Sequence, residues 1–143
     1  MGAKMTIKED KVILWENDRD KFWLFSVPCE NQYIYINGKP CITFGIAYEN
    51  AFYKGYDYIT IFDHYLTETI AKMESVYANL SGEFRLFDTG ADTDGYVDFK
   101  MYSLGRLKVS GRLGATFSSN SLTFEFVADQ TLLKPLIHSL TIT

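Results

Sequence analysis

Asp88 lies in the segment of this sequence whose residue types could do chemistry most directly. The segment reads Leu86-Phe87-Asp88-Thr89-Gly90-Ala91-Asp92, so two apolar residues precede an Asp-Thr-Gly-Ala turn. Two carboxyl groups brought together, one from each of two subunits, share a proton and can activate a water molecule. Asp, Thr and Gly are also the residues from which ordinary turns are built, so the surrounding sequence has to decide between the two interpretations.

The segment around Asp88 resembles the active-site loop of retroviral-type aspartic proteases, but its surroundings differ from that family. A flap hairpin should follow the loop, and an apolar-apolar-Gly segment should follow much later, before a short helix. The candidate for that second segment, Ser103-Leu104-Gly105-Arg106, comes too soon to leave room for a flap. The long helix predicted before the loop also has no place in that fold. We therefore expect Asp88 to be a turn residue, with a hydrolase, such as an aspartic-protease-like dimer through Asp88, as an alternative function.

The acidic loop that follows lacks the spacing of a calcium site. Asp92, Asp94 and Gly95 resemble an acidic Asp-x-Asp-Gly turn. In the register of a calcium loop, however, Gly90 would occupy the first ligand position and Met101 the last. We therefore expect a hairpin turn with solvated carboxylates.

The histidines and cysteines give no sign of a metal or catalytic centre. His64 and His138 are the only histidines, and neither has a second His or a Cys at the spacing of zinc ligands. The sequence contains no Gly-x-Ser-x-Gly segment, which would hold a nucleophilic serine in position. Cys29 and Cys41 are too few for a disulfide scaffold, and two buried thiols in a reduced cytosolic protein are favoured over a bridge. We expect no catalytic residue, no metal and no cofactor.

Two loops combine carboxylates with aromatic rings, which together suit the binding of another protein. One loop runs from Glu49 to Asp57 and the other from Asp88 to Asp98. Carboxylates steer a basic partner toward the surface, and aromatic side chains anchor it once it is bound. The expected partner-binding residues are Glu49, Phe52, Tyr53, Tyr56, Asp57, Asp92, Asp94 and Tyr96.

Alternation of apolar and polar residues predicts the strands that must position these loops. The strongest case is the hairpin within Arg106–Ile137, where Leu107, Val109, Leu113, Ala115 and Phe117 alternate with basic or small polar residues. The turn at 118–121 then leads to a returning strand with Leu122, Phe124 and Phe126 on one face. Further strands are expected at residues 12–15, 22–29, 33–36, 42–48, 58–62, 83–87 and 96–102, with a tight turn at Asn37-Gly38.

Helical spacing appears twice in the chain. Leu66, Ile70, Met73, Tyr77 and Leu80 predict one long helix over about 66–80. The expected caps of this helix are Asp63 or Thr67 at its start and Gly82 at its end. A short C-terminal helix, capped by Asp129, follows from the stripe of Leu132, Leu133, Leu136 and Ile137. Phe124 is expected to be buried under Ile70 and Met73 of the long helix.

Length and composition limit the class of protein. A chain of 143 residues with 47% hydrophobic residues is large enough for one domain, residues 1–143, with its own core. The aromatic share of 16% favours sheet. A formal net charge of -4 argues against a nucleic-acid partner and is compatible with a basic protein partner. No apolar run approaches the length of a membrane span and the first residues lack a signal sequence, so we expect a cytoplasmic location and no membrane partner.

Four segments of the chain are similar to one protein group, the immunity proteins of the wall-associated (WapI-type) toxin systems and, more loosely, of contact-dependent growth inhibition. They are the Trp-containing strand Lys21–Val27, the helical segment Leu66–Met73, the strand Gly105–Leu113, and a tail with Leu122, Phe124, Phe126, Asp129, Gln130 and Leu133. The resemblance implies a bacterial cytoplasmic protein without catalytic residues. Such a protein binds and neutralises a cognate toxin C-terminal domain, often a nuclease. The tyrosine-rich loop at residues 49–58 departs from the group's pattern and is either a recognition surface or an insertion.

Together these features predict a single α+β domain with a mainly antiparallel β-sheet or sandwich, one long helix and a short C-terminal helix. The expected function is a non-enzymatic immunity protein. A small-ligand-binding β-module is a further alternative, because aromatic-rich sheets can enclose pockets. A large apolar cavity would favour that alternative, and a filled core would count against it.

Overall fold

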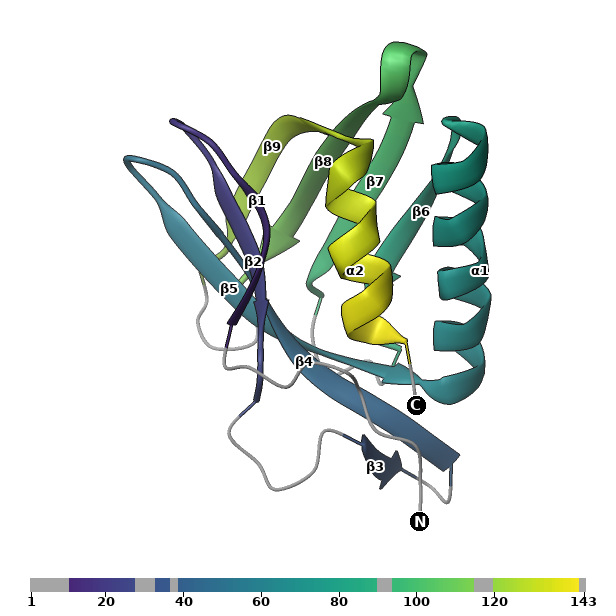
Figure 1. The fold of residues 1–143 in the computed structure, drawn as a ribbon. Coiled ribbons are helices and arrows are strands. Elements are labelled where there is room, and N and C mark those ends of the chain that lie inside the picture. Colours follow the sequence, from purple (N-terminus) through teal and green to yellow (C-terminus); the bar gives the residue numbers. More distant parts are fainter. Residues whose placement is uncertain (1–10, 28–32, 37–38, 90–93, 115–119, 142–143) are drawn as a thin grey trace.

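The computed structural model describes residues 11–27, 33–36, 39–89, 94–114 and 120–141, which form the predicted α+β fold (Figure 1). Two antiparallel sheets face one another, and two helices pack beside them. The first sheet holds β1 (Lys11–Glu16), β2 (Lys21–Phe25), β3 (Tyr33–Ile36), β4 (Lys39–Glu49) and β5 (Lys54–Phe62). The second sheet holds β6 (Gly82–Phe87), β7 (Tyr96–Tyr102), β8 (Arg106–Leu113) and β9 (Leu122–Asp129). The helices are α1 (Asp63–Asn79) and α2 (Leu133–Leu140), and short 3-10 turns occur at Ser103–Gly105 and Gln130–Leu132.

The long strand β4 organises the first sheet. One of its edges pairs with β5 from Cys41 opposite Phe62 to Glu49 opposite Lys54. Its other edge pairs with β2 at one end and with the short β3 at the other. Strand β1 pairs with β2 and completes the sheet. The strands β2 and β3, which are consecutive in the chain, therefore share one edge of β4 and do not pair with each other.

The second sheet is an antiparallel meander in chain order, and it confirms the predicted hairpin of β8 and β9. Leu107, Val109 and Leu113 of β8 are buried, as are Phe124 and Phe126 of β9. Val97 and Phe99 of β7 are buried as well. Ala115, Phe117 and the first half of the predicted turn, residues 118 and 119, lie outside the described residues.

Aromatic rings fill the space between the two sheets. The ring of Phe22 on β2 lies 5.4 Å from Phe126 and 6.1 Å from Phe99 of the second sheet. Tyr48 on β4 stacks on Phe124 at 4.6 Å with a 9° angle between the rings. Such ring pairs add to the free energy gained by apolar burial and hold the two sheets in a defined register.

Phe124 is buried, but the prediction that it lies under the long helix is wrong. Strand β9 forms one edge of the second sheet, whereas α1 packs beside β6 at the opposite edge (Figure 1). The rings that contact Phe124 are those of Phe22, Tyr48 and Phe126. Sequence periodicity shows which face of a strand is buried but not which element covers that face.

Helix α1 begins and ends differently from the prediction. It starts at Asp63 directly after β5, and Phe62 occupies the N-cap position without a side-chain cap, so the expected caps Asp63 and Thr67 are wrong. Thr67 instead donates from its hydroxyl to the carbonyl of Asp63. At the C-terminal end Leu80 adopts the left-handed conformation at φ 52°, and Gly82 already belongs to β6. The glycine stop was predicted two residues too late.

The buried stripe of α1 is also narrower than its sequence pattern. Leu66, Met73 and Val76 are buried, whereas Tyr77 and Leu80 are exposed. The helix flanks the edge strand β6 (Figure 1), and its buried residues lie along one line of the helix surface.

Helix α2 follows β9 as predicted. Asp129 caps the preceding 3-10 turn, because its side chain accepts a hydrogen bond from the backbone N–H of Thr131. The apolar side chains of the turn and helix that are fully buried are Leu132, Leu133, Leu136 and Leu140. The helix contacts both α1 and β1, and so packs between the first sheet and the long helix that flanks β6.

Two further expectations concern the cysteines and membrane spans. Cys41 is buried on β4, while Cys29 and the turn Asn37-Gly38 lie outside the described residues. Within the described part of the chain, neither helix has the length and apolar character needed to span a membrane.

Candidate partner-binding site

The segment Glu49–Asp57, predicted as one exposed loop, is mostly strand. Only residues 50–53 form the turn, because Lys54–Asp57 pair with β4 as the first part of β5. Asp57 points inward, with 0% of its surface exposed, so the exposed loop position expected for this partner-binding candidate is wrong. Its carboxylate accepts hydrogen bonds from the backbone N–H groups of Tyr58 and Gly114, at 3.0 and 3.1 Å. Asp57 therefore connects β5 to the end of β8.

Asp88 is also buried rather than solvated. Its carboxylate, with 7% of the residue exposed, accepts a hydrogen bond from the backbone N–H of Thr60 at 2.9 Å. The next residue, Thr89, donates its N–H to the carbonyl of Thr60, and its hydroxyl accepts from the N–H of Phe62, both at 2.9 Å. These bonds cover the outer edge of β5 with side-chain oxygens, which protects an edge strand from pairing with another chain. This arrangement gives the Asp-Thr pair a structural role and counts against the protease alternative.

The described residues of the second predicted loop, Asp88–Asp98, do not form one continuous surface with the first loop, Glu49–Asp57. Asp92 lies outside the described residues, and Asp94 is exposed. Tyr96 is half-buried on the outer face of the second sheet, where the guanidinium carbon of Arg85 lies 4.3 Å from its ring centre. Arg85 in turn makes a two-pronged ion pair with Asp98, at 2.6 and 2.9 Å. Tyr96 therefore lies on the outer surface of the second sheet, apart from the exposed residues of the turn 50–53.

Two turns of the same construction lie side by side at one end of the first sheet. In the turn 17–20, the side-chain oxygen of Asn17 accepts from the backbone N–H groups two and three residues later, at 2.9 and 2.7 Å. In the turn 50–53, Asn50 makes the equivalent bonds at 2.9 and 2.8 Å. A backbone bond from the first to the fourth residue closes each turn, at 3.0 and 2.9 Å. Because Asn side chains fix both turns, the residues at their tips are held in place before any partner arrives.

Tyr48 connects the two turns. Its hydroxyl donates a short hydrogen bond to a carboxylate oxygen of Asp20 and accepts one from the side-chain amide of Asn50 at 3.3 Å. Burial, and after it the hydrogen bond to Asp20, raises the pKa of Tyr48 to about 12. The hydroxyl therefore stays protonated, and remains a donor, throughout the physiological pH range.

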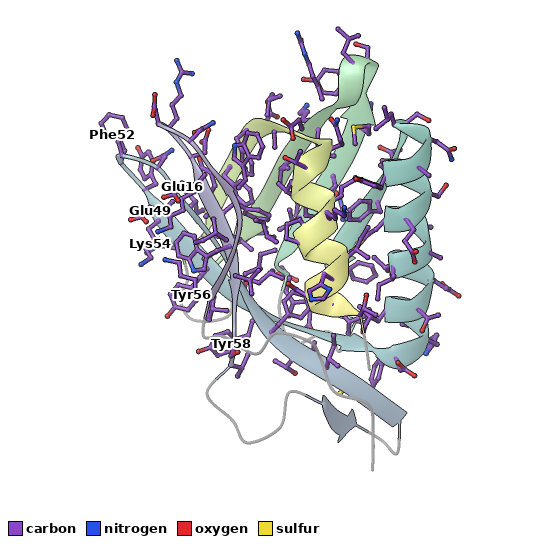
Figure 2. The ribbon with its side chains drawn as sticks, viewed as in Figure 1. Glu16, Glu49, Phe52, Lys54, Tyr56 and Tyr58 are labelled. Carbon is purple, nitrogen blue, oxygen red and sulfur yellow. The ribbon has the colours of Figure 1, made fainter. Side chains whose placement is uncertain are left out.

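A groove of about 790 Å³ opens between these two turns and β9, and we call it the two-turn groove. Its charged side chains are three carboxylates and one guanidinium, from Asp18, Asp20, Glu125 and Arg19. Phe52 lines the groove and has 85% of its surface exposed, and the neighbouring Tyr53 has 63% exposed. Figure 2 shows Phe52 projecting from the tip of the first sheet, away from the rest of the molecule. The groove thus combines net negative charge with an exposed aromatic ring.

Three acidic residues of the two-turn groove were absent from the predicted site. Asp18 and Asp20 belong to the segment Glu16–Lys21, which reads as an ordinary charged turn, and Glu125 belongs to the polar face of a strand. The common signal in the sequence is an asparagine at the first position of each turn, Asn17 and Asn50. That signal predicts two similar turns, but their proximity follows only from the pairing of β2 with β4.

Tyr48→Phe is expected to lower the stability of the chain at pH 8 and to make it less sensitive to alkaline pH. The folded-state pKa of Tyr48 is above its ordinary value of 10.0, so the stabilisation is complete below pH 10 and is lost as the pH rises toward about 12. Urea unfolding of both proteins at pH 8 and pH 11.5 measures this change. The other tyrosines are common to both proteins and cancel in the difference. A difference in stability that is the same at both pH values would contradict the role of the hydroxyl.

Neither a metal site among the described residues nor a similarity to known proteins assigns a function to this chain. Among the residues that the structure describes, no cluster of three or more His, Cys, Asp or Glu side chains is arranged to hold a metal ion. Comparison with protein-family models, with curated proteins and with solved structures gives no significant match.

Proposed function

We propose that this chain is a cytoplasmic immunity protein that binds and neutralises the C-terminal domain of a bacterial toxin. The observation that carries the proposal is Phe52, which is 85% exposed on a turn held by Asn50, beside the carboxylates of the two-turn groove. Large exposed aromatic side chains on soluble proteins are typical of surfaces that bind other proteins. The similarity of four sequence segments to WapI-type immunity proteins supports the same function.

The charge of the two-turn groove favours a basic partner. A nuclease toxin needs a basic surface to hold the phosphates of its substrate. Asp18 is an exposed carboxylate that would steer such a surface toward the groove. Glu125 is exposed as well, although it forms an ion pair with Lys108 at 3.3 Å. The fixed turn lowers the entropic cost of binding, because the backbone at Phe52 does not have to be ordered when the partner arrives.

The small-ligand alternative receives less support from the interior of the fold. The layer between the sheets, where a β-module would enclose its ligand, is filled by stacked rings that include Phe22, Tyr48 and Phe124. The largest buried side chains of the described core come from both sheets and α1 and have under 2% of their surface exposed. A filled core of this kind leaves binding to the surface of the molecule.

Phe52→Ala is expected to weaken binding to the toxin domain by about tenfold, mainly through faster dissociation, because an anchoring ring is lost. The toxin is to be identified by co-purification from the native operon and taken as the product of the neighbouring open reading frame. Surface plasmon resonance then gives the association and dissociation rates. Phe87→Ala is the matched control, since Phe87 is an exposed aromatic residue on the outer face of β6, away from the groove.

Charge reversal separates steering from anchoring in the same experiment. Asp18→Lys is expected to slow association and to reduce its dependence on salt, with little change in dissociation. Wild-type rates in both the Phe52 and the Asp18 variants would place the interface elsewhere. Failure of the neighbouring gene product to bind the wild-type chain would contradict the immunity function itself.

A further inference from the structure

The outer face of the first sheet carries a row of four charges that alternate in sign across four strands. Glu16 of β1 lies opposite Lys21 of β2, and Lys21 lies opposite Glu49 of β4. Glu49 in turn lies opposite Lys54 of β5. The side chains of Glu16, Glu49 and Lys54 extend from the same side of the molecule in Figure 2. Read across the sheet, the row is negative, positive, negative, positive.

An apolar row runs parallel to the charged row, two residues away along β2, β4 and β5 and three residues away along β1, where the register shifts between Ile13 and Trp15. Its members in strand order are Ile13, Trp23, Ala47 and Tyr56. Ile13 has 39% and Tyr56 41% of its surface exposed at the two ends, whereas Trp23 and Ala47 in the middle are buried. A hollow of about 320 Å³ on this face is lined by Trp23, Phe25, Ala47, Lys54, Tyr56 and Tyr58. The face is therefore an apolar sheet surface bordered by charges.

Three lysine side chains cover the ring of Trp23 in the monomer. The ammonium groups of Lys11, Lys21 and Lys54 lie 4.5, 5.4 and 5.6 Å from the centre of the tryptophan ring. The neighbouring ammonium group of Lys21 lowers the pKa of Lys11, which reflects the crowding of like charges over one ring. Flexible lysine stems can move aside, so this cover can be exchanged for a partner surface.

We propose that the outer face of the first sheet binds a second copy of this chain, with the two faces stacked about a two-fold axis parallel to the strands, between β2 and β4. Such an axis reverses the order of the strands in the facing copy. Glu16 then faces Lys54 of the second copy, and Lys21 faces Glu49 of the second copy. Every member of the alternating row meets a charge of opposite sign, which is the self-complementarity that a two-fold interface requires.

The apolar rows match under the same operation. Trp23 faces Ala47 of the second copy, so the largest side chain of the row meets the smallest one. Ile13 faces Tyr56 of the second copy, which brings together the two exposed ends of the row. Lys11 faces Tyr58 of the second copy, where its ammonium group gains an aromatic ring. Sheets packed face to face with aligned strands are a common arrangement in proteins.

The proposed dimer surface is separate from the two-turn groove. The groove is lined by β9, by the two turns and by Tyr48 on the inner face of β4. The dimer surface is the opposite face of β1, β2, β4 and β5, which points away from the second sheet. Phe52, at the tip of the turn, is not part of either paired row. Loss of the dimer and loss of toxin binding are therefore independent outcomes.

Charge-swapped variants test the pairing directly. Wild-type protein is expected to change from monomer to dimer with rising concentration in sedimentation velocity experiments. Lys54→Glu alone and Glu16→Lys alone each place two like-charge contacts in the dimer, and each is expected to weaken it by about tenfold. An equimolar mixture of these two variants is expected to form a heterodimer, because its cross-contacts are all attractive.

The double variant with Glu16→Lys and Lys54→Glu separates the interface from effects within one chain. In its sheet, both altered residues lie next to a residue of like charge, but across the interface every pair is again opposite in sign. Recovery of the dimer in this variant can therefore come only from contacts between copies. A wild-type chain that stays monomeric at all concentrations, or single variants that dimerise as wild type does, would overturn the proposal. Melting curves confirm that each variant is folded.

Discussion

Replacing Phe124 with alanine is expected to lower the free energy of unfolding by about 3–5 kcal/mol. The ring is buried between the sheets, stacked on Tyr48 at 4.6 Å and tilted against Phe22 at 6.1 Å. Its removal leaves a cavity that neighbouring rings from two different sheets cannot fill, because each is held by its own strand. Urea denaturation monitored by circular dichroism measures the loss.

Val127 supplies the matched control on the same strand. It is one position beyond Phe126 and points to the outer face, with 49% of its surface exposed. Val127→Ala is expected to cost less than about 1 kcal/mol, the range of strand propensity at such positions. Equal losses for Phe124→Ala and Val127→Ala would show that the wrong face of β9 has been placed inside.

Asp88→Ala is expected to lower the free energy of unfolding by about 2–3 kcal/mol, because it leaves the buried N–H of Thr60 without its charged acceptor. This loss is larger than expected for the solvated turn residue predicted from the sequence. Asp88→Asn keeps an acceptor oxygen and is expected to cost less. Toxin neutralisation is expected to be unchanged in Asp88→Asn, since the carboxylate contacts β5 and not a partner.

Asp94 provides the control for a general effect of charge in this loop. It is exposed, so Asp94→Ala is expected to change stability by about 0.5 kcal/mol or less. Wild-type stability of Asp88→Ala would contradict the proposed contribution of the hydrogen bond between Asp88 and the edge of β5. A folded Asp88→Asn protein that has lost its biological effect would restore the hydrolase alternative.

Local patterns were enough to predict most elements of this fold. The alternation in Arg106–Leu113 and Leu122–Asp129 predicts two strands with one buried face, because side chains on a strand point alternately to its two sides. Asp129 predicts the start of the C-terminal helical segment, since an N-cap acts on a backbone group only two residues away. These signals are local in the chain, and therefore the sequence alone determined them.

Only the tertiary structure decided which polar residues are buried and which residues form a surface. Asp57 and Asp88 lie in polar segments that are typical of exposed loops. The pairing of β5 with β4 turns Asp57 inward, and the fold places Asp88 against the edge of β5. The two-turn groove depends on contacts between residues far apart in the chain, such as Tyr48 and Asp20, which are 28 positions apart. The alternating charges of Glu16, Lys21, Glu49 and Lys54 become a row only through the register of four strands. Pairing and register are set by the packing of the whole core, and for this reason no local window of the sequence contains them.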